Sequence, residues 1–402
     1  MAGPLEGFRI VDLTSVISGP LATMILADQG ADVIKVETPR GGDFTRASAN
    51  RRGGFSASFV NNNRNKRSIA LDLKNPKGLE ALMAIAAGAD AFIQNFRPGV
   101  AERIGVGEEA VRAARPDIVY VSISGFGHRG KLANRPVYDP LIQAISGLTT
   151  VQAGSDGERP RLVRTILPDK LTGVTAAQAL TAALLARERS GHGQHVRLSM
   201  LDSVIAFLWS SDMGSQTFVG DELPQQAAQS FIDLIYETAD GYISVAVQTD
   251  KQWRGLTQAL ERPEWLDDPR FATQESRQVN IDDRLGLTQE VLKTNNSAHW
   301  LARLEAADIP CVPVLTRNQM ISNEQIAANR TVIETEHPDA GRLRQSRPAA
   351  LFSETPTGPP RPAPRLGADT DDVLGEAGFD AAGIAALGEA GAFGEAWKGD
   401  AA

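Results

Sequence analysis

The residue best suited to covalent chemistry is Asp169, which follows Pro168 at the start of a long Ala- and Leu-rich stretch. That stretch predicts a helix to about Arg189, where a Ser-Gly pair ends it. A carboxylate at a helix start most often caps the helix by accepting a backbone N–H. The same position lets the helix dipole favour an ionised carboxylate, which can act as a nucleophile. The residues alone leave both roles open for Asp169.

A second candidate site is a group of basic residues concentrated in the N-terminal part of an otherwise acidic chain. Such a group can form a pocket for a phosphorylated ligand, or it can lie on solvated loops. Spacing alone does not decide between these two interpretations. The group consists of Arg40, Arg46, Arg64, Lys66, Arg67, Arg97 and Arg103.

Two other motifs and the single cysteine give weaker evidence for a functional site. Residues 125–130 spell the dinucleotide fingerprint GxGxxG after a predicted strand, but Pro136 interrupts the helix that must follow. His192 and His195 have the spacing of a metal-binding pair on a helix, yet the glycines beside His192 break any helix there. We therefore expect a mobile glycine loop at 125–130 and no metal site. Cys311 is the only cysteine, which excludes an internal disulfide, and its apolar neighbours predict a buried, inert thiol.

Composition excludes several classes of protein. The 402 residues carry a formal net charge of −8, which argues against a general nucleic-acid binder. The sequence has no run of 18 apolar residues, and Glu6 and Asp12 fall where a signal peptide needs an apolar core. We therefore expect a cytoplasmic enzyme without a membrane or nucleic-acid partner.

The elements that must position these residues alternate between strand and helix. Strands rich in β-branched residues are separated by helical segments that start at Pro or Asn and end at Gly. This alternation predicts an α/β fold with a parallel sheet covered by helices. The expected strands are 9–13, 31–37, 68–73, 91–96, 118–123 and 196–200.

Segments along the whole chain resemble the class III coenzyme A transferases, the family of formyl-CoA and carnitine-CoA transferases. The α-methylacyl-CoA racemases belong to the same superfamily. The matching segments, in the family's order, are 4–7, 11–14, 19–20, 30–37, 42–43, 65–68, 95–99, 138–140, Asp169, 191–194, 239–242 and 362–367.

The resemblance implies a Rossmann-like large domain built from both chain ends, a smaller domain and an interlocked homodimer. Together with the change in sequence texture near residue 225, it predicts four regions. Residues 1–200 form the N-terminal part of the large, CoA-binding domain, and 201–224 form a linker helix. Residues 225–330 form a small α+β domain, and 331–402 form a return linker and the C-terminal part of the large domain.

The resemblance also assigns roles to residues. Asp169 matches the catalytic aspartate, no metal or permanent cofactor is implied, and CoA enters as a substrate. The positions that match CoA-binding residues overlap the basic group found independently. They are Arg40, Lys66, Arg67, Asn95, Phe96, Arg103 and Tyr138.

Three departures from the family patterns narrow the function. Racemases of the superfamily carry a histidine where this chain has Tyr138, and without that base proton abstraction beside the thioester is harder. The formyl-CoA branch has a glutamine at Ile17 and a glycine run where this chain has residues 247–250. These two differences weaken an assignment to formate or oxalate.

We therefore predict a CoA transferase that moves CoA from an acyl-CoA thioester to a free carboxylic acid. The route implied runs through a mixed anhydride and then a CoA thioester on Asp169. Backbone N–H groups near Gly19 or in the 125–130 loop are candidates for stabilising the oxyanions. The alternatives are an α-methylacyl-CoA racemase or related isomerase, and a CoA-binding protein without turnover.

Overall fold

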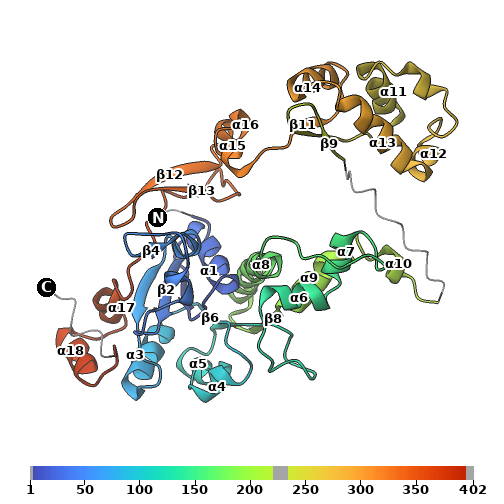
Figure 1. Ribbon diagram of the computed structural model, residues 1–402. Helices are drawn as coiled ribbons and strands as arrows, with labels where there is room; N and C mark the ends of the chain where they lie inside the picture. Colours follow the sequence, from blue (N-terminus) through green and yellow to red (C-terminus); the bar gives the residue numbers. More distant parts are fainter. Residues whose placement is uncertain (1–2, 221–233, 395–402) are drawn as a thin grey trace. The chain divides into compact units, whose positions relative to one another are not determined.

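The computed structural model describes residues 3–220 and 234–394. The chain divides into two compact units (Figure 1). The large unit contains residues 1–222 and 330–402, so both ends of the chain contribute to it. The small unit contains residues 223–329. Because several sequence-predicted site residues lie before position 222, the large unit is described first.

The large unit is organised around a six-stranded parallel sheet, which confirms the predicted α/β class. The strands are short, and the four central ones are almost wholly buried, as expected for a parallel sheet covered on both faces, whereas the two edge strands are only partly buried. Their order across the sheet is β5-β2-β1-β6-β7-β8. The bounds are β1 (Arg9–Asp12), β2 (Asp32–Glu37), β5 (Arg67–Ala70), β6 (Ala91–Gln94), β7 (Val119–Ser124) and β8 (His195–Ser199).

Each face of this sheet has its own apolar core. On one face, α1 (Ser18–Asp28) and α8 (Leu167–Ser190) pack against the strands through small and branched side chains such as Ala22, Leu26 and Leu180. The other face is covered by helices from both ends of the sequence. They are α3 (Pro76–Ala87), α4 (Val100–Arg103), α5 (Glu108–Ala114), α17 (Thr370–Glu376) and α18 (Ala381–Glu389).

The strand order creates a switch point between β1 and β6. From β1 the chain builds the sheet outward through β2 to β5, and then it returns to β6 and builds in the opposite direction. The helix after β1 therefore packs on one face and the helices after β6 on the other. Such a point opens a crevice at the carboxyl ends of the strands, where ligands bind in open α/β sheets.

The C-terminal segment is joined to the N-terminal strands by polar contacts. Arg67 on β5 forms ion pairs with both Asp32 on β2 and Glu376 on α17, and Arg9 on β1 also pairs with Glu376. The backbone N–H of Ser68 donates to the Asp369 carboxylate at 2.8 Å. These contacts attach the end of the chain to the edge of the sheet that β5 forms.

Two hairpins and several short helices complete the large unit. The hairpins are β3 (Arg51–Arg52) with β4 (Phe55–Ser56), and β12 (Val332–His337) with β13 (Gly341–Ser346). The further helices are η1 (Phe44–Ala47), α2 (Ala57–Asn63), α6 (Asp139–Ile145), α7 (Leu148–Ala153), α9 (Met200–Trp209) and α10 (Gly214–Thr217). Part of the predicted linker helix, residues 221–224, lies outside the described residues.

The small unit has the α+β character predicted for it. A three-stranded antiparallel sheet of β9 (Ile235–Glu237), β10 (Tyr242–Val245) and β11 (Cys311–Pro313) packs on helices, with stacked Trp253 and Trp265 in the core. Cys311 is half-buried, not buried as its neighbours suggested. The helices are α11 (Asp250–Ala259), η2 (Pro263–Leu266), α12 (Gln274–Val279), α13 (Ile281–Leu292), α14 (Ser297–Ala306), α15 (Arg317–Ile321) and α16 (Glu324–Ala328).

Among residues 3–220 and 234–394, no helix has both the length and the apolar character needed to cross a bilayer.

Candidate active site

A pocket of about 190 Å³ opens at the switch point between β1 and β6, and we call it the Asp169 pocket. The loops after β1, β6 and β7 contribute its walls, together with the start of α8. Four residues to which the family resemblance assigned a role meet here, because these segments converge at one edge of the sheet. They are Asn95, Phe96, Tyr138 and Asp169, and they are joined by Arg97 of the basic group and Gly125 of the glycine loop.

Asp169 is not the N-cap of its helix. Helix α8 begins at Leu167 with Ile166 as the N-cap residue, and no side chain caps it. The Asp169 carboxylate instead accepts hydrogen bonds from the side chain and the backbone N–H of Ser18, the first residue of α1. Of the two roles left open by the sequence, the geometry therefore removes the capping role.

The environment of Asp169 raises its pKa to about 6. Burial of the half-buried carboxylate is the largest cause, and the nearby negative charge of Asp139 adds to it. The hydrogen bonds from Ser18 act in the opposite direction but are outweighed. The sequence suggested that the helix start keeps the Asp169 carboxylate ionised, but the structure raises its pKa instead. With a pKa of about 6, most of the Asp169 carboxylate is still ionised at pH 7.

Asp139 is a second carboxylate beside Asp169 that the sequence analysis did not assign. It is 3% exposed at the start of α6, and its Oδ2 accepts the backbone N–H of Asp169 at 3.3 Å. Its Oδ1 accepts the side-chain amide of Gln143 at 2.7 Å. The sequence signal that could have identified Asp139 is its place directly after Tyr138 in a family-matched segment. Asp139 therefore fixes the backbone of the first turn of α8.

The loop after β1 is held in an unusual conformation at the pocket. Val16 has φ of +74°, a region that β-branched residues rarely adopt. Its N–H points to the Asp43 carboxylate at 3.3 Å, and the Asn95 side chain forms two hydrogen bonds with the backbone of Ser15, at 3.0 and 2.8 Å. Asn95 and Asp43 thus fix the segment that leads to Ser18.

A larger and more apolar pocket of about 450 Å³ lies along the same edge, and we call it the apolar pocket. Ser15 and Phe96 line both pockets. The sequence analysis did not identify its remaining walls, of which Phe44 is 76% exposed. The available signal was that residues 71–74 end a predicted strand, because loops at strand carboxyl ends commonly form ligand sites. Those walls include Val36, Thr38, Phe44, 71–74, Val100 and Ile104.

Of the predicted basic residues, Arg97 lines the Asp169 pocket, and the others line neither pocket. Arg40 is exposed on the loop after β2, and Arg103 is exposed in the last turn of α4. Neither Lys66 nor Arg67 lines the Asp169 pocket or the apolar pocket. The Lys66 ammonium is 0% exposed and bonds to Asp12 Oδ2 at 3.1 Å and to Asn63 Oδ1 at 2.8 Å. Burial lowers the pKa of Lys66 to about 8 despite the attraction of Asp12.

Lys66 belongs to a buried ion network that we define as Asp12, Lys35, Asp43 and Lys66. The Lys35 ammonium, also 0% exposed, bonds to Asp43 Oδ2 and to the carbonyl of Thr14, both at 2.9 Å. Burial acts to raise the pKa of Asp12, but Lys66 and Lys35 outweigh it and hold that pKa well below its usual range. The network thus holds the start of the loop that carries Ser15 and Val16.

The remaining motifs have structural partners. No helix begins within residues 125–136, all of which the structure describes, so the fingerprint is a loop. His195 bridges Glu108 and Ser122 through its two ring nitrogens, at 2.5 and 2.8 Å. Among the described residues, no group of three or more His, Cys, Asp or Glu is placed to hold a metal ion.

Comparison with known proteins decides the family. The sequence matches CoA-transferase family III over residues 5–370. The chain belongs to CoA-transferase family III. It is 33% identical over 380 residues to the human protein named succinyl-CoA:glutarate CoA-transferase, covering 93% of this chain and 86% of that one. It is 32% identical over 414 residues to formyl-CoA:oxalate CoA-transferase of Escherichia coli O6:H1, covering 96% and 99%.

The fold comparison agrees with this family. A solved structure of a CaiB/BaiF family protein from Brucella suis superposes with a TM-score of 0.82 at 29% identity, covering 94% of this chain and 100% of that one. The family resemblance drawn from the motifs is thus confirmed. This family III chain is a transferase enzyme that moves CoA between acyl-CoA thioesters and carboxylic acids.

Proposed function

We propose that this enzyme transfers CoA through covalent intermediates on Asp169. The observation that carries the proposal is the state of that carboxylate. It lines a pocket at the switch point, accepts hydrogen bonds from Ser18, and has a pKa of about 6. Among the described residues, no cationic side chain forms an ion pair with it, so its lone pairs are available to a substrate.

The first half of the reaction loads CoA onto the enzyme. An Asp169 oxygen attacks the thioester carbonyl of the donor, and the C–S bond breaks to release CoA thiolate and leave a mixed anhydride. The thiolate then attacks the aspartyl carbonyl of the anhydride. The donor acid leaves as a carboxylate, and Asp169 carries CoA as a thioester. A carboxylate suits this role because the anhydride keeps the acyl group activated, whereas a serine ester would not.

The second half repeats these steps in reverse order with the acceptor. The acceptor carboxylate attacks the aspartyl thioester, which releases the thiolate and forms a new anhydride. The thiolate attacks the acceptor's acyl carbon, giving the new acyl-CoA and the free Asp169 carboxylate. Neither half consumes a proton, so the site needs oxyanion stabilisation more than an acid or a base.

The oxyanions would form beside two helix starts. Ser18 begins α1 and Leu167 begins α8, and the start of each helix is its positive dipole end, although the first N–H groups of α8 already donate to Thr165 and Asp139. The Ser18 N–H already bonds to Asp169. Donors fixed before the reaction stabilise developing negative charge without reorganisation. The proposed oxyanion donor, the Ser18 N–H, is adjacent to Gly19, where the sequence analysis expected such donors.

The apolar pocket is the proposed place for the body of CoA. Its volume of about 450 Å³ is within the range of small-ligand sites, and Ser15 and Phe96 connect it to the Asp169 pocket. Arg40 and Arg103 are exposed and available to the phosphates, and Lys74 lines the pocket itself. Phosphate contacts by Lys66 and Arg67 stay a prediction, and they would require both side chains to leave carboxylate partners.

We also propose that the enzyme works as an interlocked homodimer. The family resemblance implies it, and large apolar side chains on the outside of α8 and α9 fit association with another chain. Interlocked chains cannot separate without unfolding, so sedimentation at nanomolar concentration should give no folded monomer. The apolar side chains in question are Val174, Leu185, Phe207 and Trp209, each about half exposed.

The test combines substrate screening with trapping of the intermediate. A matrix of acyl-CoA donors and acids, including the succinate–glutarate and formate–oxalate pairs named for the relatives, identifies the substrates by mass spectrometry of CoA products. With a donor and no acceptor, CoA should accumulate on Asp169 as an adduct that hydroxylamine releases. An adduct on another carboxylate would refute the proposal. Solvent deuterium at Cα of the acyl group, without any acceptor, would instead indicate a racemase.

A further inference from the structure

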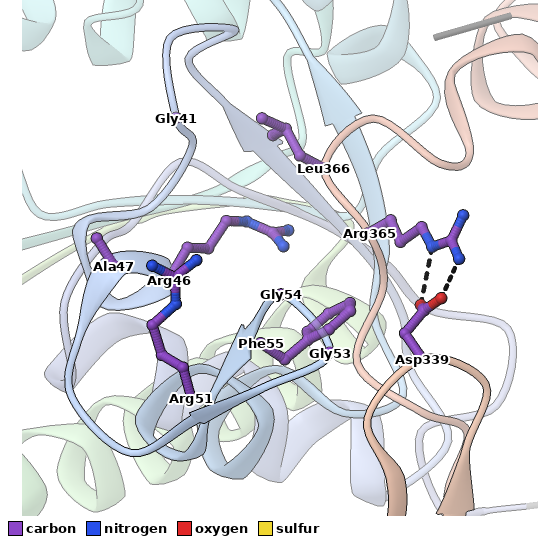
Figure 2. Close-up of a pocket in the computed structure, with 10 residues that line it drawn as sticks. All are labelled: Gly41, Arg46, Ala47, Arg51, Gly53, Gly54, Phe55, Asp339, Arg365 and Leu366. Atoms are coloured by element: carbon purple, nitrogen blue, oxygen red, sulfur yellow. Dashed lines mark hydrogen bonds and ion pairs between the residues drawn. The ribbon is translucent and has the colours of Figure 1, made fainter.

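A third pocket in the large unit, of about 530 Å³, has no role in this mechanism. We call it the arginine pocket, because three of its lining residues are Arg46, Arg51 and Arg365 (Figure 2). Arg46 and Arg51 enter from the segment around η1 and β3, whereas Asp339 and Arg365 enter from the opposite side. It shares no lining residue with the Asp169 pocket or the apolar pocket.

Two of the three guanidinium groups are fixed in place. Arg46 donates twice to the Glu37 carboxylate, at 2.8 and 2.7 Å, and its guanidinium lies 3.7 Å from the ring centre of Phe59. Arg365 forms two hydrogen bonds with Asp339 (Figure 2). Among the described residues that line the pocket, Asp339 is the only carboxylate, and this pairing balances its charge. The two fixed groups therefore lose little conformational entropy when a ligand binds.

Arg51 has no such partner. Its side chain is exposed, and no other described residue forms a hydrogen bond or ion pair with its guanidinium. Figure 2 shows the Arg51 side chain on the same side of the pocket as Arg46. Because Glu37 balances Arg46 and Asp339 balances Arg365, Arg51 is the one arginine of the lining whose charge no described carboxylate balances. A carboxylate or phosphate group is the ligand that a planar guanidinium binds best.

The backbone of the pocket also leaves room for a ligand. Gly41 and Gly54 have φ of +83° and +84°, and open space lies where a Cβ would be at each. Two glycines in succession, Gly53 and Gly54, form the turn that places Arg51 opposite Ser56 in the hairpin. Phe55 adds an apolar surface between the charged walls. A small anion can therefore approach the main chain closely.

We propose that the arginine pocket is a second binding site, and that it binds a small oxyanion with Arg51 as its principal contact. A free carboxylic acid and a phosphate ester share this chemistry. The proposal is independent of covalent transfer on Asp169, because the two sites have no lining residue in common.

The test is calorimetric titration of the full chain with inorganic phosphate and, separately, with glutarate, each with and without saturating CoA. At least one anion should bind, and CoA should leave its affinity unchanged within about twofold. Arg51→Gln should weaken binding at least about fivefold. The matched control Arg189→Gln removes the same charge from the exposed end of α8 and should bind like wild type.

Each outcome has a defined meaning. Binding of phosphate alone identifies a phosphate ester as the ligand class, and binding of glutarate alone identifies a carboxylic acid. Equal affinities in the two variants, competition by CoA, or binding of neither anion would overturn the proposal. Circular dichroism of Arg51→Gln confirms folding, which the exposed position of Arg51 makes secure. If CoA transfer itself were absent, the phosphate and glutarate titrations would still report on this pocket.

Discussion

Asp12 and Asp169 are two aspartates near the carboxyl edge of one parallel sheet, and their surroundings are opposite. Asp12 is fully buried, bonds to Lys66, Thr14 and Thr23, and has a strongly lowered pKa. Asp169 is half-buried, and burial with a neighbouring carboxylate raises its pKa to about 6. The difference shows that position at the edge does not make a carboxylate reactive. The partners of the carboxylate determine whether it supports the fold or remains available to a substrate.

The first prediction has the largest expected effect and concerns Asp169, the carboxylate without a cationic partner. Asp169→Asn cannot form the anhydride, so CoA transfer should fall by at least ~10³. Because the folded-state pKa is raised above its unfolded value, the ionised group costs stability at pH 7, and the neutral amide should not lower the melting temperature. Turnover assays and thermal unfolding measure the two quantities. Near-normal CoA transfer by this variant would show that Asp169 is not the nucleophile and differs from Asp12 only in its surroundings.

The second prediction concerns Asp12, the carboxylate that is paired with Lys66. Lys66→Met leaves Asp12 without its ammonium partner in a fully buried position, so the free energy of unfolding should fall by about 3–5 kcal/mol. The matched control is Lys77→Met, because the Lys77–Glu80 pair is about half exposed and should contribute at most about 1 kcal/mol. Chemical denaturation gives both values. Equal losses in the two variants would contradict a structural role for the network.

The third and smallest effect is the pH dependence of transfer. With a pKa of about 6, roughly nine-tenths of Asp169 is ionised at pH 7 and about one-tenth at pH 5. The value of kcat/KM, which reports ionisation in the free enzyme, should therefore fall about tenfold between these values, with the midpoint near pH 6. Circular dichroism across the range controls for unfolding. A rate that stays constant down to pH 5 would show that Asp169 has an ordinary carboxylate pKa.

Much of the fold could be predicted from local patterns. β-Branched runs and helix-ending glycines located the strands, because burial on both faces of a parallel sheet requires continuous apolar segments. The predicted strand 68–73 ends at Ala70 in the structure. Residues 71–73 instead line the apolar pocket, and the side chains of Leu71 and Leu73 serve that wall as well as they would serve a strand.

The site was predicted in part. Asp169, Asn95, Phe96 and Tyr138 meet in one pocket. Charge clustering did not reveal that Lys66 and Arg67 have carboxylate partners, because Asp12 and Glu376 lie far away in sequence. A positive charge in a pattern looks the same whether it is free or paired. Three-dimensional pairing is the information that the sequence pattern lacked.

The contribution of α17 and α18 to the large unit has a consequence for biosynthesis. Val373, Leu374 and Leu387 cover the same face of the sheet as α3 and α5. A ribosome delivers these residues only after those of the small unit, long after β1 has emerged. That face of the sheet therefore stays only partly covered while the residues of the small unit are being made, and this interval is when the nascent chain most needs protection from aggregation.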